Sequence, residues 1–423
     1  MSAPRTFAQK QLDRSSGQEG LRPGDIVNAE PDLYMSHTAS WRCIKTLERL
    51  PGWTIRHPER CAMVMDHVSP ARTPKAAGFH HTCREFADAN GIEKFYDVEA
   101  GISHLVLMDN GHVRPGELII GTDSHSTIYG ALGALGTGVG YSELTAAWVT
   151  GELWMRVPES IRVDLDGELP PDVHPMDLML RLIGDLTADG ATYCSVEFAG
   201  EHVGRLSISQ RMTLCNLAME LGAKNGYVRP DATTDDFLEG AGVQPGDYDA
   251  LVPDDDAEYR QTVALDCSDL TPQVACPHTV DNVAPIGEVA GTHLDQVFIG
   301  SCANAKYDDL VDAARILRGR TIAPRLRLVV TPGSRNVMAK AASDGTLATL
   351  IEAGALVTNP GCGACAGDGG VMADGERTLS TANRNYRGRM GSYESEIFLS
   401  SPATAAASAL AGHIADPREL GGG

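Results

Sequence analysis

The stretch Leu118-Ile119-Ile120-Gly121-Thr122-Asp123-Ser124-His125 decides how the rest of the chain is interpreted. Three apolar residues end in a glycine, and then come a hydroxyl, a carboxylate, a second hydroxyl and an imidazole. A short apolar run of this kind predicts a buried strand. In open α/β sheets, ligands bind beyond the carboxyl ends of the strands. The stretch therefore predicts a sheet strand that delivers polar groups to a ligand site.

The same arrangement recurs three times along the chain. The apolar run 62–65 is followed by Asp66 and His67, and the run 297–299 by Gly300-Ser301-Cys302. The run 355–357 is followed by Asn359-Pro360-Gly361-Cys362-Gly363-Ala364-Cys365. Further strands are predicted at 105–108, 160–165 and 328–330. Four polar strand ends favour one shared site.

Strand-like runs alternate with helical patterns, which predicts an α/β architecture. The texture changes at Val157-Pro158, before the strand predicted at 160–165, and a second boundary is expected between 284 and 293. We therefore predict three domains: 1–157, 158–288 and 289–423.

The composition limits the classes of partner. The 423 residues include 35 Lys and Arg against 56 Asp and Glu, a formal charge of −21. This excess disfavours nucleic acid and anionic membranes as partners. Ten acids fall between Asp231 and Glu258, a stretch predicted to be a solvated, loop-rich surface. The sequence shows neither a signal peptide nor a membrane-length apolar segment, so we expect a cytoplasmic protein.

Three cysteines suggest a metal cluster. Cys362 and Cys365 form a C-x-x-C pair, and Cys302 lies 60 positions before Cys362. Three thiolates can hold three corners of a 4Fe–4S cluster and leave one iron without a protein ligand. A redox-active pair and ordinary buried thiols are the alternatives. The other seven cysteines show no paired spacing and are expected to be small buried residues.

Acid–base candidates accompany these cysteines. Carboxylates stand beside imidazoles in Asp66-His67 and Asp123-Ser124-His125, and a carboxylate can set the tautomer and pKa of a histidine. His104 is expected at the start of the strand predicted at 105–108. For each histidine taken alone, a structural role is an equally good interpretation.

Two further segments carry polar groups in a regular pattern. A helix predicted over 211–222 places Asn216 and Glu220 four residues apart on one face, either at the site or toward solvent. Residues 383–389 contain three arginines, which suit bidentate binding of carboxylates. The glycine-rich segment 130–140 lacks the spacing of a dinucleotide-binding loop.

Taken together, these segments resemble the aconitase superfamily, and within it the large subunits of 3-isopropylmalate dehydratase and its homoaconitase-like and methylmalate-dehydratase-like relatives. The resemblance runs from about residue 30 to residue 417. It implies three aconitase-type α/β/α domains around an iron–sulfur cleft. It also implies a hydro-lyase that removes water from, and returns it to, a hydroxylated di- or tricarboxylate, most simply in leucine biosynthesis.

The resemblance assigns roles residue by residue. The cluster ligands it implies are Cys302, Cys362 and Cys365. The catalytic residues it implies are Asp66, His67, His104, Asp123, His125 and Glu220. The residues it implies for contact with substrate or cluster are Ser124, Asn216, Asn304, Asn383, Arg384 and Arg389.

The same resemblance implies a partner. Single-chain aconitases carry a swivelling domain that supplies a serine base, and this chain has no counterpart up to Gly423, so a separate small subunit and a heterodimer are expected. Ser36, His37, Leu105 and Ala303 depart from the family pattern. These departures make a related acid, such as a methylmalate or homocitrate, a competing substrate. Competitors from other classes are a C-x-x-C redox protein and a non-catalytic RNA-binding or assembly protein.

Overall fold

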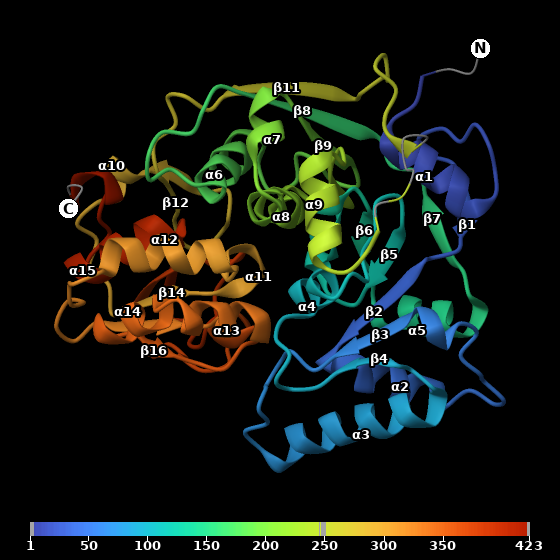
Figure 1. The fold of residues 1–423 in the computed structure, drawn as a ribbon, viewed down its shortest axis with the longest axis horizontal. Helices are drawn as coiled ribbons and strands as arrows, with labels where there is room; N and C mark the ends of the chain where they lie inside the picture. The colour runs from blue at the N-terminus through green and yellow to red at the C-terminus, as the bar shows by residue number, and fades with distance from the viewer. Residues whose placement is uncertain (1–3, 245, 247–250, 421–423) are drawn as a thin grey trace.

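The first sheet forms the N-terminal part of the molecule. The computed structural model describes residues 4–244, 246 and 251–420 (Figure 1). Five parallel strands are ordered β4-β3-β2-β5-β6. They are β2 (Leu33–His37), β3 (Cys61–Val64), β4 (Lys94–Tyr96), β5 (Leu118–Gly121) and β6 (Leu135–Gly138). Around them lie α1 (Phe7–Ser16), η1 (Thr38–Ser40), α2 (Trp41–Leu47), η2 (Pro58–Arg60), α3 (Pro74–Asn90), α4 (Ser103–Asp109), η3 (Ser124–Leu132) and α5 (Tyr141–Thr150). An antiparallel ribbon pairs β1 (Ile26–Ala29) with β7 (Leu153–Arg156).

The second sheet has four parallel strands, ordered β10-β9-β8-β11. They are β8 (Ser160–Asp166), β9 (Ser195–Ala199), β10 (Asn225–Val228) and β11 (Gln261–Asp266). Its helices are α6 (Pro175–Leu186), α7 (Glu201–Arg205), α8 (Ile208–Leu217), η4 (Ala218–Leu221) and α9 (Ala232–Gly240).

The third sheet has seven strands, ordered β13-β12-β18-β17-β14-β15-β16. They are β12 (Gln273–Ala275), β13 (Val283–Pro285), β14 (Gln296–Ile299), β15 (Arg327–Val330), β16 (Leu356–Val357), β17 (Arg377–Ser380) and β18 (Glu396–Leu399). Strand β12 is antiparallel to both neighbours, and the other pairs are parallel. The helices are α10 (Ile286–Val289), α11 (Ser301–Asn304), α12 (Tyr307–Leu317), α13 (Arg335–Ser343), α14 (Thr346–Glu352), η6 (Gly363–Ala366), α15 (Pro402–Ala411) and η7 (Pro417–Leu420).

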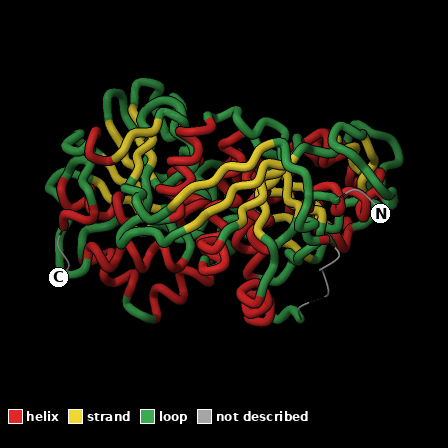
Figure 2. Tube along the Cα trace, turned by 90° about the horizontal axis from the view of Figure 1, so that it is seen from above, coloured by secondary structure: helices red, strands yellow, loops and turns green. Residues whose placement is uncertain are grey.

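The third sheet lies toward one end of the long axis, and the first and second sheets lie together toward the other end, the second above the first in Figure 1. Seen from above, helices and loops flank the strands (Figure 2). One continuous buried core joins apolar residues from all three sheets. The α/β fold class predicted from the sequence is confirmed. The three domain ranges stay a proposal. Because β12 and β13 pair within the third sheet, we would place the second boundary before Gln273 instead of after residue 288.

The glycine-rich segment 130–140 serves close packing. A Cβ atom on Gly130 would lie 1.6 Å from the carbonyl oxygen of Gly226 in β10, and one on Gly136 would lie 2.1 Å from the Ser126 oxygen. Only glycine allows these backbones to approach so closely. Gly130 therefore lets η3 pack directly against β10 of the second sheet, and Gly136 lets β6 pack directly against η3.

One predicted strand is wrong. The run 105–108 lies inside the helix α4, and His104 therefore begins a helical turn and not a strand. Residues 103–108 are all buried, so the helix shows no polar face, and a short apolar run cannot distinguish a buried strand from a buried helix. The helix predicted over 211–222 is present as α8 followed by η4, and it ends at Gly222 with φ of 83°.

The acidic stretch 231–258 is less loop-like than predicted. Asp231 caps the helix α9 and forms an ion pair with the buried Arg211. Residues 245 and 247–250 of this stretch lie outside the described residues. None of the helices in the described part of the chain is both long and apolar enough to cross a bilayer.

Candidate active site

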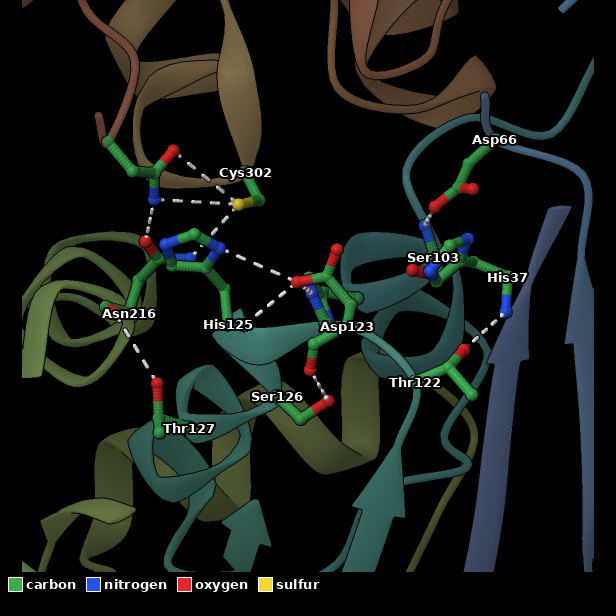
Figure 3. A network of polar contacts seen from close by, with 12 residues as sticks. His37, Asp66, Ser103, Thr122, Asp123, His125, Ser126, Thr127, Asn216 and Cys302 are labelled. Carbon is green, nitrogen blue, oxygen red and sulfur yellow. Dashed lines mark hydrogen bonds and ion pairs between the residues drawn. The ribbon is translucent and has the colours of Figure 1, made fainter. Parts of the chain in front are cut away.

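The carboxyl ends of the first sheet supply one side of the site. Strand β3 leads to Asp66 and His67, β2 ends in His37, and β5 leads to Asp123. Since these strands are parallel neighbours, their ends lie at one edge. Figure 3 shows the labelled side chains in a row, with Asp66 and His37 on one side, Asp123 and His125 in the middle, and Cys302 beyond them.

Asp66 and His67 form a buried acid–base pair. The Nδ1 atom of His67 lies 2.7 Å from Asp66 Oδ1, and Asp66 Oδ2 accepts a hydrogen bond from the Ser103 backbone at 3.0 Å. Burial opposes the charge on His67, but the carboxylate of Asp66 outweighs burial and raises the pKa of His67 to about 8. The contacts with His67 lower the pKa of Asp66 in spite of its burial. The imidazole is 26% exposed, so it is partly accessible to solvent.

His37 lies against this pair. Its ring centroid is 4.7 Å from that of His67, and its Nδ1 atom accepts a hydrogen bond from Ala39 at 3.2 Å. Burial and the neighbouring His67 lower the pKa of His37, so it favours the neutral form. Among the described residues, His37, Asp66 and His67 are the one set of three metal-ligating groups that lie within 4.8 Å of one another.

A second chain of charges runs through the middle of the site. Asp123 lies 3.1 Å from His104 Nε2 and accepts a hydrogen bond from the backbone of His125 at 2.8 Å. The Nε2 atom of His125 lies 2.8 Å from Glu220, which also accepts from Arg384 Nε at 2.8 Å. Burial opposes these charges, but the mutual contacts raise the pKa of His125 and lower that of Glu220. The two carboxylates on either side of His125 thus favour its cationic form.

Cys302 lies at the turn after β14, where amide groups surround its sulfur. Asn216 donates to Cys302 Sγ at 3.2 Å, and Asn383 donates to it at 3.6 Å (Figure 3). Asn383 also donates to Asn216, which ties the two amides together. Ser301 has a φ of 81°, a strained value for a residue other than glycine, at the start of this turn.

Cys362 and Cys365 approach the site from the third sheet. The backbone N–H of Cys362 donates to the carbonyl oxygen of Asp66 at 3.1 Å, which places this loop against the acid–base pair. Arg389 donates to Cys365 Sγ at 3.6 Å. Burial opposes the charge of Cys365, but Arg389 outweighs burial and lowers the pKa of this thiol. Burial and nearby carboxylates raise the pKa of Cys302 to about 12 and that of Cys362 well above its ordinary value.

The three cysteines suit a cluster better than a single ion. Thiolates at ~2.3 Å from one tetrahedral zinc ion would lie about 3.8 Å apart. Among the described residues, the sulfurs of Cys302, Cys362 and Cys365 do not all lie within 4.8 Å of one another. All ten cysteines are free thiols, and the charges of these three affect one another's pKa. Two amide donors and one guanidinium already face two of the sulfurs. These features fit a 4Fe–4S cluster bound by three thiolates.

Most residues singled out in the sequence lie in or beside this network. Asn216 and Glu220 do not face solvent. Both are buried, and they contact Cys302 and His125 respectively. Asn304 is directed elsewhere: its amide donates to the Thr381 carbonyl oxygen at 2.9 Å and contacts Met176. Ser124 lines a small pocket of about 290 Å³ together with Thr122 and Lys224.

Two of the residues that depart from the family pattern, Leu105 and Ser36, make packing or backbone contacts within the fold. Leu105 is buried beside Gly333, and Ser36 donates to the Ala62 carbonyl oxygen at 3.3 Å. Tyr129, which the sequence analysis does not single out, has its hydroxyl 3.1 Å from His104 Nδ1. Tyr129 and His104 are 25 positions apart and lie on different helices, so no spacing in the sequence points to this contact.

Comparisons with known proteins agree with the motifs. The family model described as the aconitase family (aconitate hydratase) matches residues 62–412. The 3-isopropylmalate dehydratase large subunit 1 of Methanopyrus kandleri is 47% identical over 416 residues, which cover 98% of this chain and 99% of that protein. The probable methanogen homoaconitase large subunit of Methanosarcina mazei is 45% identical over 394 residues, which cover 93% of this chain and 100% of that protein. The crystal structure of Thermococcus kodakaraensis aconitase X aligns over 90% of this chain and 89% of that one, with a TM-score of 0.47 and 12% identity.

Proposed function

Because this chain belongs to the aconitase family, we propose that it is the large subunit of an iron–sulfur hydro-lyase, with 3-isopropylmalate as the first candidate substrate. The reaction would be the removal and return of water on a 2-hydroxy di- or tricarboxylate. One observation carries this proposal: the ends of strands in different sheets bring two buried acid–base networks together with three cysteines.

The two networks suit different roles. His67 is partly exposed and has a pKa of about 8, so it can give a proton to a departing hydroxyl and take it back. His125 is enclosed between Asp123 and Glu220 and lacks this access. We therefore assign proton transfer to His67, supported by Asp66. His104, Asp123, His125 and Glu220 would fix the geometry of the bound substrate.

The cluster would be held by Cys302, Cys362 and Cys365. When bound, it supplies one iron without a protein ligand, which is a Lewis acid for a hydroxyl oxygen. The chain's own contribution is to hold the ligands: Asn216 and Asn383 donate to Cys302, and Arg389 favours the thiolate of Cys365. Metal binding also favours deprotonation of the buried thiols whose pKa is raised.

The arginine-rich segment would bind the carboxylates of the substrate. The loop that carries it is held in place because Asn385 donates to the carbonyl oxygens of Cys276 and Thr279, at 2.8 and 3.2 Å. Arg384 is 26% exposed and forms an ion pair with Glu220, so part of its guanidinium is accessible to a substrate. Ser124 and Asn383 are proposed as neighbouring contacts. Asn304 is less suited, since its amide nitrogen is already engaged.

A small subunit is proposed as the partner, in line with the "large subunit" names of the relatives. It would supply the base that removes the proton next to a carboxylate. Exposed aromatic side chains stand near the arginines: Tyr386 is 48% exposed and Tyr393 is 71% exposed. Tyrosine and arginine are enriched at protein interfaces. The exposed surface around Tyr386 and Tyr393 is therefore the proposed region of contact with the small subunit.

A homocitrate-type acid is the second candidate substrate. The relatives named for the two substrates are 47% and 45% identical to this chain, so overall similarity does not choose between them. A redox pair would need only Cys362 and Cys365, whereas the third cysteine, Cys302, faces the same site with amide donors on its sulfur, which favours the cluster.

The test uses the chain purified anaerobically with iron and sulfide and combined with its small subunit. We expect a coloured protein with a paramagnetic cluster signal and turnover of 3-isopropylmalate above that of homocitrate and methylmalates. A colourless, iron-free product would refute the cluster. Turnover of homocitrate or a methylmalate alone would replace the first substrate with another.

A further inference from the structure

Lys306 is a buried cation directly after the turn that carries Cys302. Its side chain is 5% exposed and precedes the helix α12. The ammonium lies 2.8 Å from Asp309 Oδ2, donates to Thr213 Oγ1 at 3.1 Å, and donates to the carbonyl oxygen of Ala303. An ammonium has three N–H donors, so these three acceptors satisfy it completely.

These contacts hold the carbonyl group of Ala303, the residue that follows Cys302. The Ala303 carbonyl oxygen also accepts a hydrogen bond from Thr213 Oγ1 at 3.0 Å. Thr213 stands three residues before Asn216 on α8, and Asn216 donates to the sulfur of Cys302. One face of α8 therefore holds both the backbone and the thiol of this turn.

A further contact anchors Lys306 to a third helix. Asp309 Oδ1 lies 3.2 Å from His174 Nε2, at the start of α6. The Nδ1 atom of His174 accepts a hydrogen bond from Met176 at 3.1 Å, which leaves the proton on Nε2, toward the carboxylate. Lys306 and Asp309 thus link the Cys302 turn to α6 and α8, the helices that accompany the second sheet.

We propose that Lys306 is a positioning residue for Cys302: it holds the Ala303 peptide so that the thiolate keeps its place relative to Cys362 and Cys365. This inference rests on the proposed function, because it concerns retention of the cluster. The strained backbone at Ser301 agrees with it, because a conformation of this kind persists only where the surroundings enforce it.

The experiment compares iron retention in the full-length chain after anaerobic reconstitution. The variants are Lys306→Met, which removes the ammonium, and Lys306→Arg, which keeps a cation. Arg211→Met is the matched control, because Arg211 is also a fully buried cation, and its guanidinium binds Asp231 and Thr234 instead of the Cys302 turn. The readouts are iron per chain, the rate of iron loss to a chelator, the cluster spectrum, and thermal unfolding of the iron-free chains.

We expect Lys306→Met to lose iron about tenfold faster than wild type, because outer contacts of metal ligands contribute about 10–100-fold to affinity. Lys306→Arg should restore most of the retention, and Arg211→Met should retain iron as wild type does. If Lys306→Met does not fold, Thr213→Val tests the same peptide contact and should also lose iron faster.

The two levels of the proposal fail differently. A wild-type chain that takes up no iron would overturn the proposed function and this inference with it. Normal loading of wild type, with iron loss from Lys306→Met no faster than from Arg211→Met, would overturn this inference alone. Equal iron loss from Thr213→Val and wild type would do the same where Lys306→Met is insoluble.

Discussion

Replacing Asp66 by Asn should move the alkaline limit of activity to lower pH. In the native protein, Asp66 raises the pKa of His67 from 6.5 to about 8, against the effect of burial. Without that carboxylate, burial and Arg389 disfavour the imidazolium and Asp123 alone favours it, so the pKa of His67 should fall to about 6.5 or below. At pH 7.5 the protonated fraction would then fall from roughly three-quarters to roughly one-tenth or less.

Activity that needs the imidazolium should therefore fall about eightfold at pH 7.5 and much less at pH 6, since the native and variant imidazoles are then both largely protonated. The measurement is the pH dependence of kcat/KM for the reconstituted pair of subunits. Asp109→Asn is the matched control, because Asp109 accepts from Ser334 and contacts no histidine of the site. An unchanged alkaline limit in Asp66→Asn would refute the assignment of His67 as the proton donor.

The same pair contributes to stability. Because the pKa of His67 is raised on folding, its contribution is fully present below pH 6.5 and is lost as the pH rises through about 8. The difference between a pKa of 6.5 in the unfolded chain and one of about 8 in the folded chain corresponds to at most about 2 kcal/mol. The free energy of unfolding of the iron-free chain should show this loss in wild type and not in Asp66→Asn.

Three further predictions address the cluster, the substrate and the fold. Cys302→Ala should abolish iron binding, whereas Cys215→Ala, a buried thiol on α8, should leave the iron content unchanged in the same assay. Arg384→Met should raise KM by about tenfold or more, because a charged hydrogen bond contributes about 1.5–3 kcal/mol, and kcat should change less. Gly130→Ala should destabilise the chain by about 1–3 kcal/mol or prevent folding, because its Cβ would overlap a β10 carbonyl. Gly204→Ala, where nothing lies within 4 Å, should unfold at the same denaturant concentration as wild type or higher.

The fold was predictable where local pattern and burial agree. The runs at 118–120 and 297–299 are short, apolar and bounded by glycine, and both are strands. The run at 105–108 is also short and apolar, but it is a helix. The pattern did not reveal this, because α4 is buried on all sides and lacks the polar face that identifies a helix. The strands that extend the third sheet before residue 289 were missed, since β12 is only three residues long.

The sequence indicated most residues of the candidate site, but it indicated fewer of the contacts between them. Asp66 and His67 are adjacent in sequence, so their pairing could be expected, but His125 and Glu220 are separated by 95 positions and meet only through the packing of η3 against α8. His37 entered only as a departure from a family pattern, because its contact with His67 depends on two strands lying side by side.

The charges of the site explain why a chain of net charge −21 can serve an anionic substrate, and also why we expect help from a partner. The site groups that favour a charged form balance. They are the carboxylates of Asp66, Asp123 and Glu220 with the thiolate of Cys365, against His67, His125, Arg384 and Arg389. A dicarboxylate adds two negative charges to this balanced set. Arg384 cannot bind a carboxylate at full strength while Glu220 shares it, and Arg389 is engaged by the sulfur of Cys365. Beyond the open iron of the proposed cluster, further cations are therefore expected to face the substrate, and we expect the small subunit to present them beside the exposed Tyr386.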